Sequence, residues 1–121
     1  MKKHVADIMN RTATYYPQTE QELKIDAETN ARFWSIAGSN LQFTWFEVLP
    51  GTLFKEHTHE SEQVTHVLSG ELFFRVEGEV YRLGGGDSII IPGNKKHTVW
   101  TEDIKTIAVD AWSPVNKKYN S

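Results

Sequence analysis

Two glycine-bounded stretches that carry histidines constrain the possible folds of this chain more than any other feature. The first runs from Gly51 to Gly70 and places His57 and His59 two residues apart, with Gln63 four residues after the second histidine. Because side chains at positions i and i+2 of an extended segment point to the same face, both imidazoles can converge on one point. Gln63 has the same parity and begins a β-rich run, which can bring its amide alongside. The stretch therefore predicts a cluster of ligand groups.

The second stretch, residues 86–97, has the pattern of a short strand, a turn and a third histidine. The run 89–91 is three isoleucines, which we expect to be buried on both sides, and Pro92 begins the turn that leads to His97. Three imidazoles and one amide oxygen make a plausible four-ligand site for a divalent metal ion. Such ligands suit zinc, iron, nickel, copper or manganese, and the sequence does not choose among them. The predicted metal ligands are His57, His59, Gln63 and His97.

The rest of the chain predicts strands and little else. A chain of 121 residues forms one domain. From residue 31, runs of aromatic and β-branched residues alternate with glycine-containing turns, and no long helical period occurs, which is typical of an all-β barrel or sandwich. Residues 1–30 are mostly polar and have no clean period. We therefore expect an N-terminal arm over residues 1–30 and a single barrel domain over residues 31–121.

Composition excludes several classes of partner. The formal net charge of -3 and the pI near 5.9 leave no electrostatic footprint for nucleic acid. No stretch is apolar enough to span a bilayer. The chain has no cysteine, so it has neither disulfides nor thiolate ligands, which suits a reducing compartment. We expect a cytoplasmic protein with no nucleic-acid or membrane partner.

The two histidine stretches resemble the paired motifs of the cupin superfamily, which are small double-stranded β-helix, or jelly-roll, barrels. The first family motif has a glycine, His-x-His, a glutamate and a second glycine at the spacing seen between Gly51 and Gly70. The second has Gly, Pro-x-Gly and His at the spacing of residues 86–97, followed by an asparagine. This chain has Gln63, Asn94 and Thr101 where the family has glutamate, glycine and asparagine. Asparagine tolerates the left-handed backbone that such a turn needs.

The replacement of glutamate by Gln63 changes the predicted chemistry. An amide donates no charge, so the four-ligand site keeps the full formal 2+ charge of its metal. Such a metal attracts an anionic ligand and acts as a Lewis acid toward a carbonyl or carboxylate oxygen. It also disfavours oxidation of a ferrous ion, because no ligand anion stabilises the ferric state. Non-redox chemistry on an oxyanionic substrate is therefore favoured.

The chain's last predicted strand supplies two further candidates. The segment 110–114 resembles an Asp-x-Phe-Ser-Pro ending found in a cupin subgroup that also carries glutamine in the first motif. That subgroup includes the pectin- and alginate-degradation cupins, which convert 4,5-unsaturated monouronates into linear 4-deoxy-5-keto-uronates. The resemblance implies that Asp110 is the acid/base and Trp112 the cavity aromatic. From the residues alone, backbone capping by Asp110 and core packing by Trp112 stay open.

We therefore expect a metal-binding cupin that acts on a small oxygen-rich or anionic molecule, most concretely an unsaturated sugar acid. One alternative is a metal-dependent dioxygenase of a small organic substrate, because three-histidine cupin sites can host ferrous iron. The other is a non-catalytic barrel that binds a small ligand. Candidate arginines for a substrate carboxylate are Arg32, Arg75 and Arg82, and candidate cavity aromatics are Trp34, Phe43, Trp45 and Trp100.

The predicted strand over residues 41–49 also bears on assembly. It carries Phe43, Trp45 and Leu49 on one face and Phe46 and Val48 on the other. A small barrel buries only one face of a strand, so the other needs a cover. We expect a homodimer, with residues 1–30 as the alternative cover.

Overall fold

A computed structural model describes residues 13–120 of the chain. The described residues form ten strands and two short 3₁₀ helices. In chain order these are η1 (Gln18–Glu20), β1 (Lys24–Ile25), β2 (Arg32–Ala37), β3 (Gln42–Val48), β4 (Leu53–His57), β5 (Glu62–Ser69), β6 (Glu71–Val76), β7 (Glu79–Gly84), β8 (Ser88–Ile91), β9 (His97–Trp100), β10 (Thr106–Ser113) and η2 (Lys117–Tyr119).

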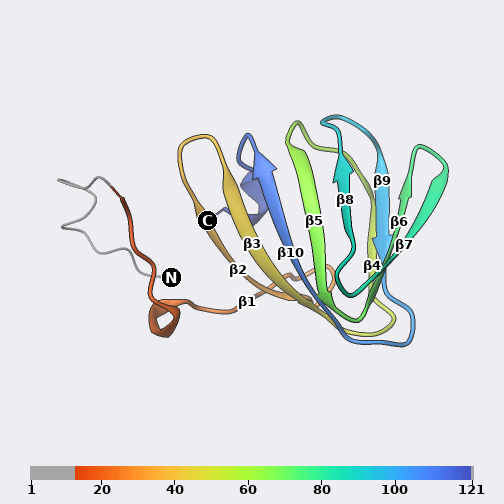
Figure 1. The fold of residues 1–121 in the computed structure, drawn as a ribbon, viewed down its shortest axis with the longest axis horizontal. Helices are drawn as coiled ribbons and strands as arrows, with labels where there is room; N and C mark the ends of the chain where they lie inside the picture. The colour runs from red at the N-terminus through yellow and green to blue at the C-terminus, as the bar shows by residue number, and fades with distance from the viewer. Residues whose placement is uncertain (1–12, 121) are drawn as a thin grey trace.

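The strands form two antiparallel sheets that face each other (Figure 1). The larger sheet has the order β1-β2-β3-β10-β5-β8, and the smaller has the order β4-β9-β6-β7. Strand β10 lies between β3 and β5, so Asp110 is directly opposite Thr44 on one side and Thr65 on the other. In the same way Trp112 is opposite Gln63. The prediction of an all-β, two-sheet barrel is confirmed.

Alternation along the strands decides what each sheet buries. On β3, Phe46 and Val48 point inward and are 6% and 2% exposed, whereas Phe43 and Trp45 lie half-buried on the outer face. The inward residues form two apolar clusters, one around Val67, Leu72, Phe74, Leu83, Ile91, Val99 and Ala108, the other around Ala31, Phe33, Phe46, Val48, Trp112 and Tyr119. Phe54 packs against both clusters, so the barrel interior is continuous.

One sequence prediction about the core is wrong. Ile91 is buried as expected, but Ile90 is 63% exposed. The reason is that β8 is an edge strand of the larger sheet, and the outward face of that edge is open. His66, which has the opposite parity to Gln63, faces outward as predicted and its Nδ1 lies 2.7 Å from the Ser88 hydroxyl.

The segments at the two ends of the described chain meet each other. Strand β1 pairs with β2 at the edge of the larger sheet. The turn after β1 contacts η2, because the Tyr119 hydroxyl donates to a carboxylate oxygen of Asp26 at 3.0 Å. Residues 24–30, expected to belong to an arm, thus join the sheet and its cavity. The expectation for residues 1–12 lies outside the described residues.

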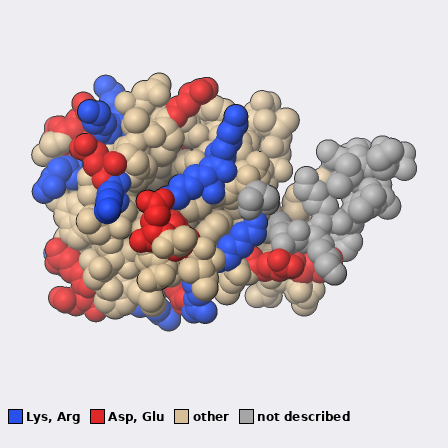
Figure 2. Space-filling view, turned by 180° about the vertical axis from the view of Figure 1, so that it is seen from behind, with Lys and Arg blue, Asp and Glu red and all other residues tan. Residues whose placement is uncertain are grey.

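Charges of both signs are mixed on one face of the molecule. On the face shown in Figure 2, lysine and arginine side chains are interspersed with aspartate and glutamate. Among the described residues, no helix is long and apolar enough to cross a membrane.

Candidate metal centre and cavity

Three histidines from different parts of the chain meet at one end of the barrel. His57 is the last residue of β4, His59 lies in the loop that follows, and His97 begins β9. His57 pairs directly with His97 across the two strands. The candidate ligand atoms of the three rings all lie within 4.8 Å of one another, so the cluster can hold a metal ion.

The two motif loops pack against each other, and this contact sets the cluster. The backbone N–H of Asn94 donates to the carbonyl of His59 at 2.8 Å. At Gly93 the backbones approach so closely that a Cβ would lie 2.4 Å from the carbonyl oxygen of Glu60, so only glycine fits. Asn94 adopts a φ of 66°, which is the left-handed conformation expected for this position.

Each histidine is oriented by a backbone carbonyl. The Nδ1 atoms of His57, His59 and His97 lie 2.7, 2.9 and 2.8 Å from the carbonyl oxygens of Lys55, Ser61 and Lys95. A carbonyl only accepts, so each Nδ1 carries the proton and each Nε2 is left with a lone pair. This outer-shell arrangement is typical of metal-binding histidines.

The Nε2 atoms are where a metal would bind. The Nε2 of His97 is buried and has no hydrogen-bond partner among the described residues. Buried polar atoms are rarely left without a partner, so this orphan points to a missing ligand. A cation between the three rings would satisfy it.

Gln63 presents its amide oxygen to the same point. Its Nε2 donates to the Thr65 hydroxyl at 2.8 Å, and the Thr65 hydroxyl donates in turn to a carboxylate oxygen of Asp110. This chain orients the amide, and its Oε1 lies 3.0 Å from the Nε2 of His59. Two acceptors that face each other at this distance require a cation, or a proton, between or beside them.

The distance between His59 and Gln63 is compatible with a shared ion. His59 Nε2 and Gln63 Oε1 lie 3.0 Å apart, so both could hold one metal ion. The donor set of three imidazoles and one amide therefore fits a divalent ion, whose identity the site does not fix.

The imidazoles are held in the form that binds metal. Desolvation by the barrel wall lowers the pKa of His57, although its edge is open to solvent at the cavity mouth. Desolvation also lowers the pKa of His97 from 6.5 to about 4, against a smaller raising effect of its bond to Lys95. Both rings are therefore neutral near pH 7, as metal ligation requires.

Asp110 is a buried carboxyl on the same cavity. Its side chain is inside the barrel, and burial raises its pKa from 3.8 to about 7, while the hydrogen bond from Thr65 offsets only part of the rise. A carboxyl with a pKa near 7 can both take up and release a proton at neutral pH. A nearby dication would draw the pKa down again.

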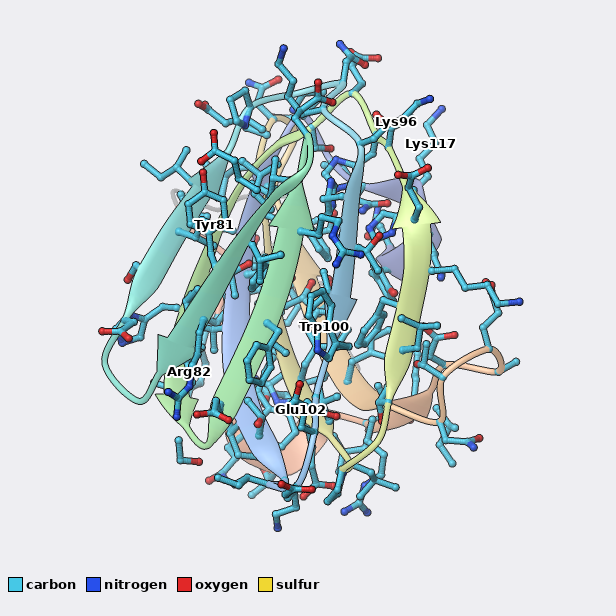
Figure 3. The ribbon with its side chains drawn as sticks, turned by 90° about the vertical axis from the view of Figure 1, so that its right-hand side faces the viewer. Tyr81, Arg82, Lys96, Trp100, Glu102 and Lys117 are labelled. Carbon is cyan, nitrogen blue, oxygen red and sulfur yellow. The ribbon has the colours of Figure 1, made fainter. Side chains whose placement is uncertain are left out.

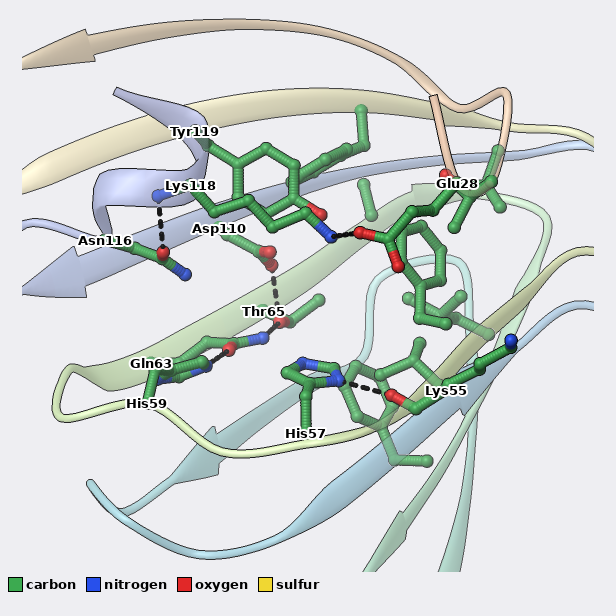
Figure 4. A pocket seen from close by; sticks show the side chains of 18 of the residues that line it. Glu28, Lys55, His57, His59, Gln63, Thr65, Asp110, Asn116, Lys118 and Tyr119 are labelled. Atoms are coloured by element: carbon green, nitrogen blue, oxygen red, sulfur yellow. Dashed lines mark hydrogen bonds and ion pairs between the residues drawn. The ribbon is translucent and has the colours of Figure 1, made fainter. Parts of the chain in front are cut away.

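The cavity has a volume of about 450 Å³, the size expected for one small molecule. Figure 4 shows His57, His59 and Gln63 on one side of it and Asp110, Tyr119, Lys118 and Glu28 on the other. Trp112 lines the cavity and is also part of the aromatic cluster, 3% exposed and stacked on Tyr119 at 5.4 Å. The Nε1 of Trp112 is buried without a described partner. Trp112 thus belongs both to the apolar core and to the cavity wall, and its role in the site stays a prediction.

Several other candidates lie elsewhere. Trp34, Phe43 and Trp45 sit together on the outer face of the larger sheet, and Trp100 lies on the outer face of the smaller sheet (Figure 3). These candidates do not line the cavity, because their strand parity turns them outward. The cavity aromatics are Phe46, Phe54, Phe74, Trp112 and Tyr119.

The three arginines proposed for a carboxylate are also outside the cavity. Arg32 pairs with Glu47, Arg82 pairs with Glu71, and Arg75 lies over the Trp100 ring at 5.5 Å. The cavity residues that sequence reasoning missed are Thr65, Lys118, Glu28 and Tyr119. Only Thr65, which shares the parity of Gln63 on one strand, carried a signal that could have revealed it.

A two-sheet barrel with a histidine cluster and a buried carboxyl at one end defines a class of small β-barrels built to hold a metal and a small molecule. A model of the cupin domain matches residues 44–109, which is more than half of the chain, and the chain belongs to the cupin family. The resemblance of the two histidine stretches to the cupin motifs is thus confirmed.

The chain is similar to known proteins both in structure and in sequence. Among solved structures, KdgF from Halomonas sp. superposes with a TM-score of 0.78 at 23% identity, covering 88% of this chain and 98% of that one. An RmlC-like cupin from Shewanella frigidimarina gives 0.78 at 22% identity, covering 87% and 94%. At such low sequence identity, the similarity shows a shared fold only. In sequence, the acireductone dioxygenase of Tuber melanosporum is 34% identical over an alignment 76 positions long, which covers 53% of this chain and 44% of that protein.

Proposed function

We propose that this protein is a metal-dependent enzyme that converts a 4,5-unsaturated uronate into the linear 4-deoxy-5-keto-uronate. The single observation that carries the proposal is the hydrogen-bond chain from Gln63 through Thr65 to Asp110, which joins the candidate metal centre to a buried acid/base. The motif resemblance to unsaturated-uronate cupins and the fold likeness to KdgF support it. His57, His59, Gln63 and His97 are the proposed ligands.

The reaction is an isomerisation and needs no oxidant. The bond between the anomeric carbon and the ring oxygen breaks, and a proton leaves the anomeric hydroxyl as the aldehyde forms. A proton is added to carbon 4 as the enol at carbon 5 becomes a ketone. A divalent ion with neutral ligands supplies Lewis-acid polarisation of a substrate oxygen when bound.

The proton transfers are assigned to Asp110. The three histidines are assigned as ligands, and Glu60 in the loop and Glu62 at the start of β5 are both exposed. Asp110 lines the cavity, and burial raises the pKa of its carboxyl, so that this one group can accept the proton from the hydroxyl and return it to carbon. Trp112 forms the wall beside it and excludes water from the reacting bond.

The experiment is turnover of unsaturated galacturonate by protein loaded separately with each candidate metal. Loss of the ultraviolet absorbance of the conjugated double bond is the expected result, with no oxygen consumed. Absence of any acceleration with every metal tested contradicts the proposal and leaves a ligand-binding barrel.

A second candidate is a dioxygenase, and the sequence likeness to acireductone dioxygenase favours it. Metal-dependent oxygen uptake with an acireductone or diketone panel would support this candidate. The amide ligand Gln63 argues against it, because a neutral ligand set disfavours the ferric state.

Assembly as a homodimer and a cytoplasmic location stay predictions. The outer face of the larger sheet supports the first, because the rings of Trp34 and Trp45 lie stacked there, 6.5 Å apart at an angle of 3°. A light-scattering mass of one chain at micromolar concentration would contradict the dimer.

A further inference from the structure

The wall of the cavity opposite the histidines carries a lysine that the motifs do not include. Lys118 lies in η2, and Figure 4 shows its ammonium across the cavity from His57. Among the described lysines and arginines, only Lys118 and Lys55 line the cavity, and the Lys55 side chain extends away from the histidines.

The backbone of Lys118 is fixed by hydrogen bonds, and its ammonium lies over the Tyr119 ring at 5.3 Å and forms ion pairs with Asp26 and Glu28. Asn116 accepts a hydrogen bond from the Lys118 N–H at 3.1 Å, and the N–H of Asn116 donates to the buried Gln42 at 2.7 Å. The next residue, Tyr119, is anchored by the hydrogen bond that its hydroxyl donates to Asp26. The Lys118 side chain is 46% exposed, so it can adjust to a ligand from a fixed base.

The present partners of the Lys118 ammonium differ in how easily they can be replaced. Glu28 lies 3.1 Å away and is 72% exposed, so this ion pair contributes little and can open into solvent. Asp26 lies 3.6 Å away, is nearly fully buried, and is already bonded by the Tyr119 hydroxyl and the Glu28 N–H. Glu28 is therefore the exchangeable partner.

We infer that Lys118 is the binding site for the carboxylate of the substrate, and that Glu28 occupies this position until the substrate displaces it. The inference rests on the proposed function for the identity of the sugar acid. Its physical basis is the geometry of the cavity: one cation faces the candidate metal centre across a space of about 450 Å³. A sugar acid there spans the two positive groups, with its carboxylate on Lys118 and a ring or hydroxyl oxygen toward the histidine wall.

The test compares binding of D-galacturonate and D-galactose by calorimetry, with and without metal. Wild-type protein is expected to prefer galacturonate in both states. Lys118→Met should weaken galacturonate binding about tenfold or more and abolish the preference, since it removes a bond to a charged group. Lys118→Arg should keep the preference, and Glu28→Gln should tighten binding a few-fold because it removes the competing carboxylate.

Lys117→Met is the matched control, because Lys117 is the preceding residue of η2 and lies on the outer rim (Figure 3). It should behave as wild type. A preference that disappears on metal removal but survives Lys118→Met overturns the inference and assigns the carboxylate to the metal. Loss of the preference in Lys55→Met but not in Lys118→Met, or no preference in wild type, overturns it as well.

Kinetics with unsaturated galacturonate separate this inference from the proposed function. Lys118→Met should raise KM about tenfold with kcat changed far less. Turnover by wild type with an unchanged KM in Lys118→Met refutes the carboxylate site alone. A galacturonate preference that depends on Lys118, without any turnover by wild type, refutes the proposed function alone.

Discussion

The two walls of the cavity differ in how they are built. The histidine wall consists of two short motif stretches, one with His57, His59 and Gln63 and the other with His97, and each imidazole is fixed by a nearby carbonyl. The opposite wall joins segments that are 90 residues apart in the Lys118–Glu28 pair, and it is held by Tyr119. The first wall is rigid and suited to a metal. The second has one exposed, exchangeable ion pair and is suited to a ligand that comes and goes.

The largest expected effect is on the histidine wall. His57→Ala combined with His97→Ala removes two of four proposed ligands and should abolish stoichiometric metal binding, measured by elemental analysis after dialysis. His66→Ala is the control, because this histidine is on β5 but faces outward to Ser88. Full occupancy in the double variant would refute the proposed ligand set.

Lowering the pH should also release the bound metal, and this release should be reversible. The pKa of His57 is lowered, and that of His97 is lowered to about 4, so protons compete with the metal only below the ordinary histidine pKa of 6.5. Occupancy should hold at pH 7 and fall between about pH 6.5 and 4. A metal retained at pH 4 would count against imidazole ligation.

Asp110→Ala tests the carboxyl that lies between the two walls. A positioned acid/base contributes about 10²–10⁴-fold, so turnover of the unsaturated uronate should fall on that scale while metal content and fold are kept. Glu62→Gln removes an exposed carboxylate from β5 and should have no effect. Wild-type turnover by Asp110→Ala would disprove the assigned role.

Thr65→Val should have a smaller effect that appears in the pH profile. The Thr65 hydroxyl lowers the pKa of Asp110, so its loss should raise that pKa and move the corresponding limb of the rate profile to higher pH. Activity should fall about tenfold, as for other outer-shell partners.

Thr44→Val is the matched control, because Thr44 flanks Asp110 on the other side of β10 but bonds Ser35 instead. A profile that shifts equally in both variants would mean that packing, not the hydrogen bond, is responsible.

The smallest effect is expected on the opposite wall. Tyr119→Phe removes the hydroxyl that bonds the ionised Asp26, and should lower the free energy of unfolding by about 1.5 kcal/mol at pH 7 in urea titration. Burial is the largest single influence on the pKa of Asp26 and by itself would raise it. The Glu28 N–H, Lys118 and Tyr119 together outweigh burial, so the pKa of Asp26 is lowered overall. The difference from wild type should therefore shrink as the pH falls below 3.8.

Tyr81→Phe is the control, because its hydroxyl bonds the exposed Glu79 at 3.1 Å and should contribute almost nothing. Equal losses in both variants would show that the Tyr119–Asp26 bond does not hold the opposite wall in place.

Much of the histidine wall could be predicted from sequence because His57, His59 and Gln63 lie close together in the chain. The expectation that one extended segment aligns them is wrong, since His59 lies in the loop between β4 and β5, which belong to different sheets, and the pairing of β4 with β9 places His97 beside His57. The other differences concern residues whose environment depends on strand order. Ile90 is exposed because β8 is an edge strand, and Trp34 and Trp45 face outward because the barrel closes on the other face of their strands.

The sequence by itself determined the cupin barrel, the histidine cluster and the candidacy of Asp110. Motif spacing indicated the histidine cluster, and the resemblance to cupins that the motifs carry implied the barrel and the role of Asp110. Only the tertiary structure decided that Thr65 links Gln63 to Asp110 and that Lys118 and Glu28 face the histidines. These contacts depend on sheet register and on where η2 docks. No local pattern in a sequence records them, because the energy that sets them is the packing of Tyr119 and its neighbours across the whole barrel.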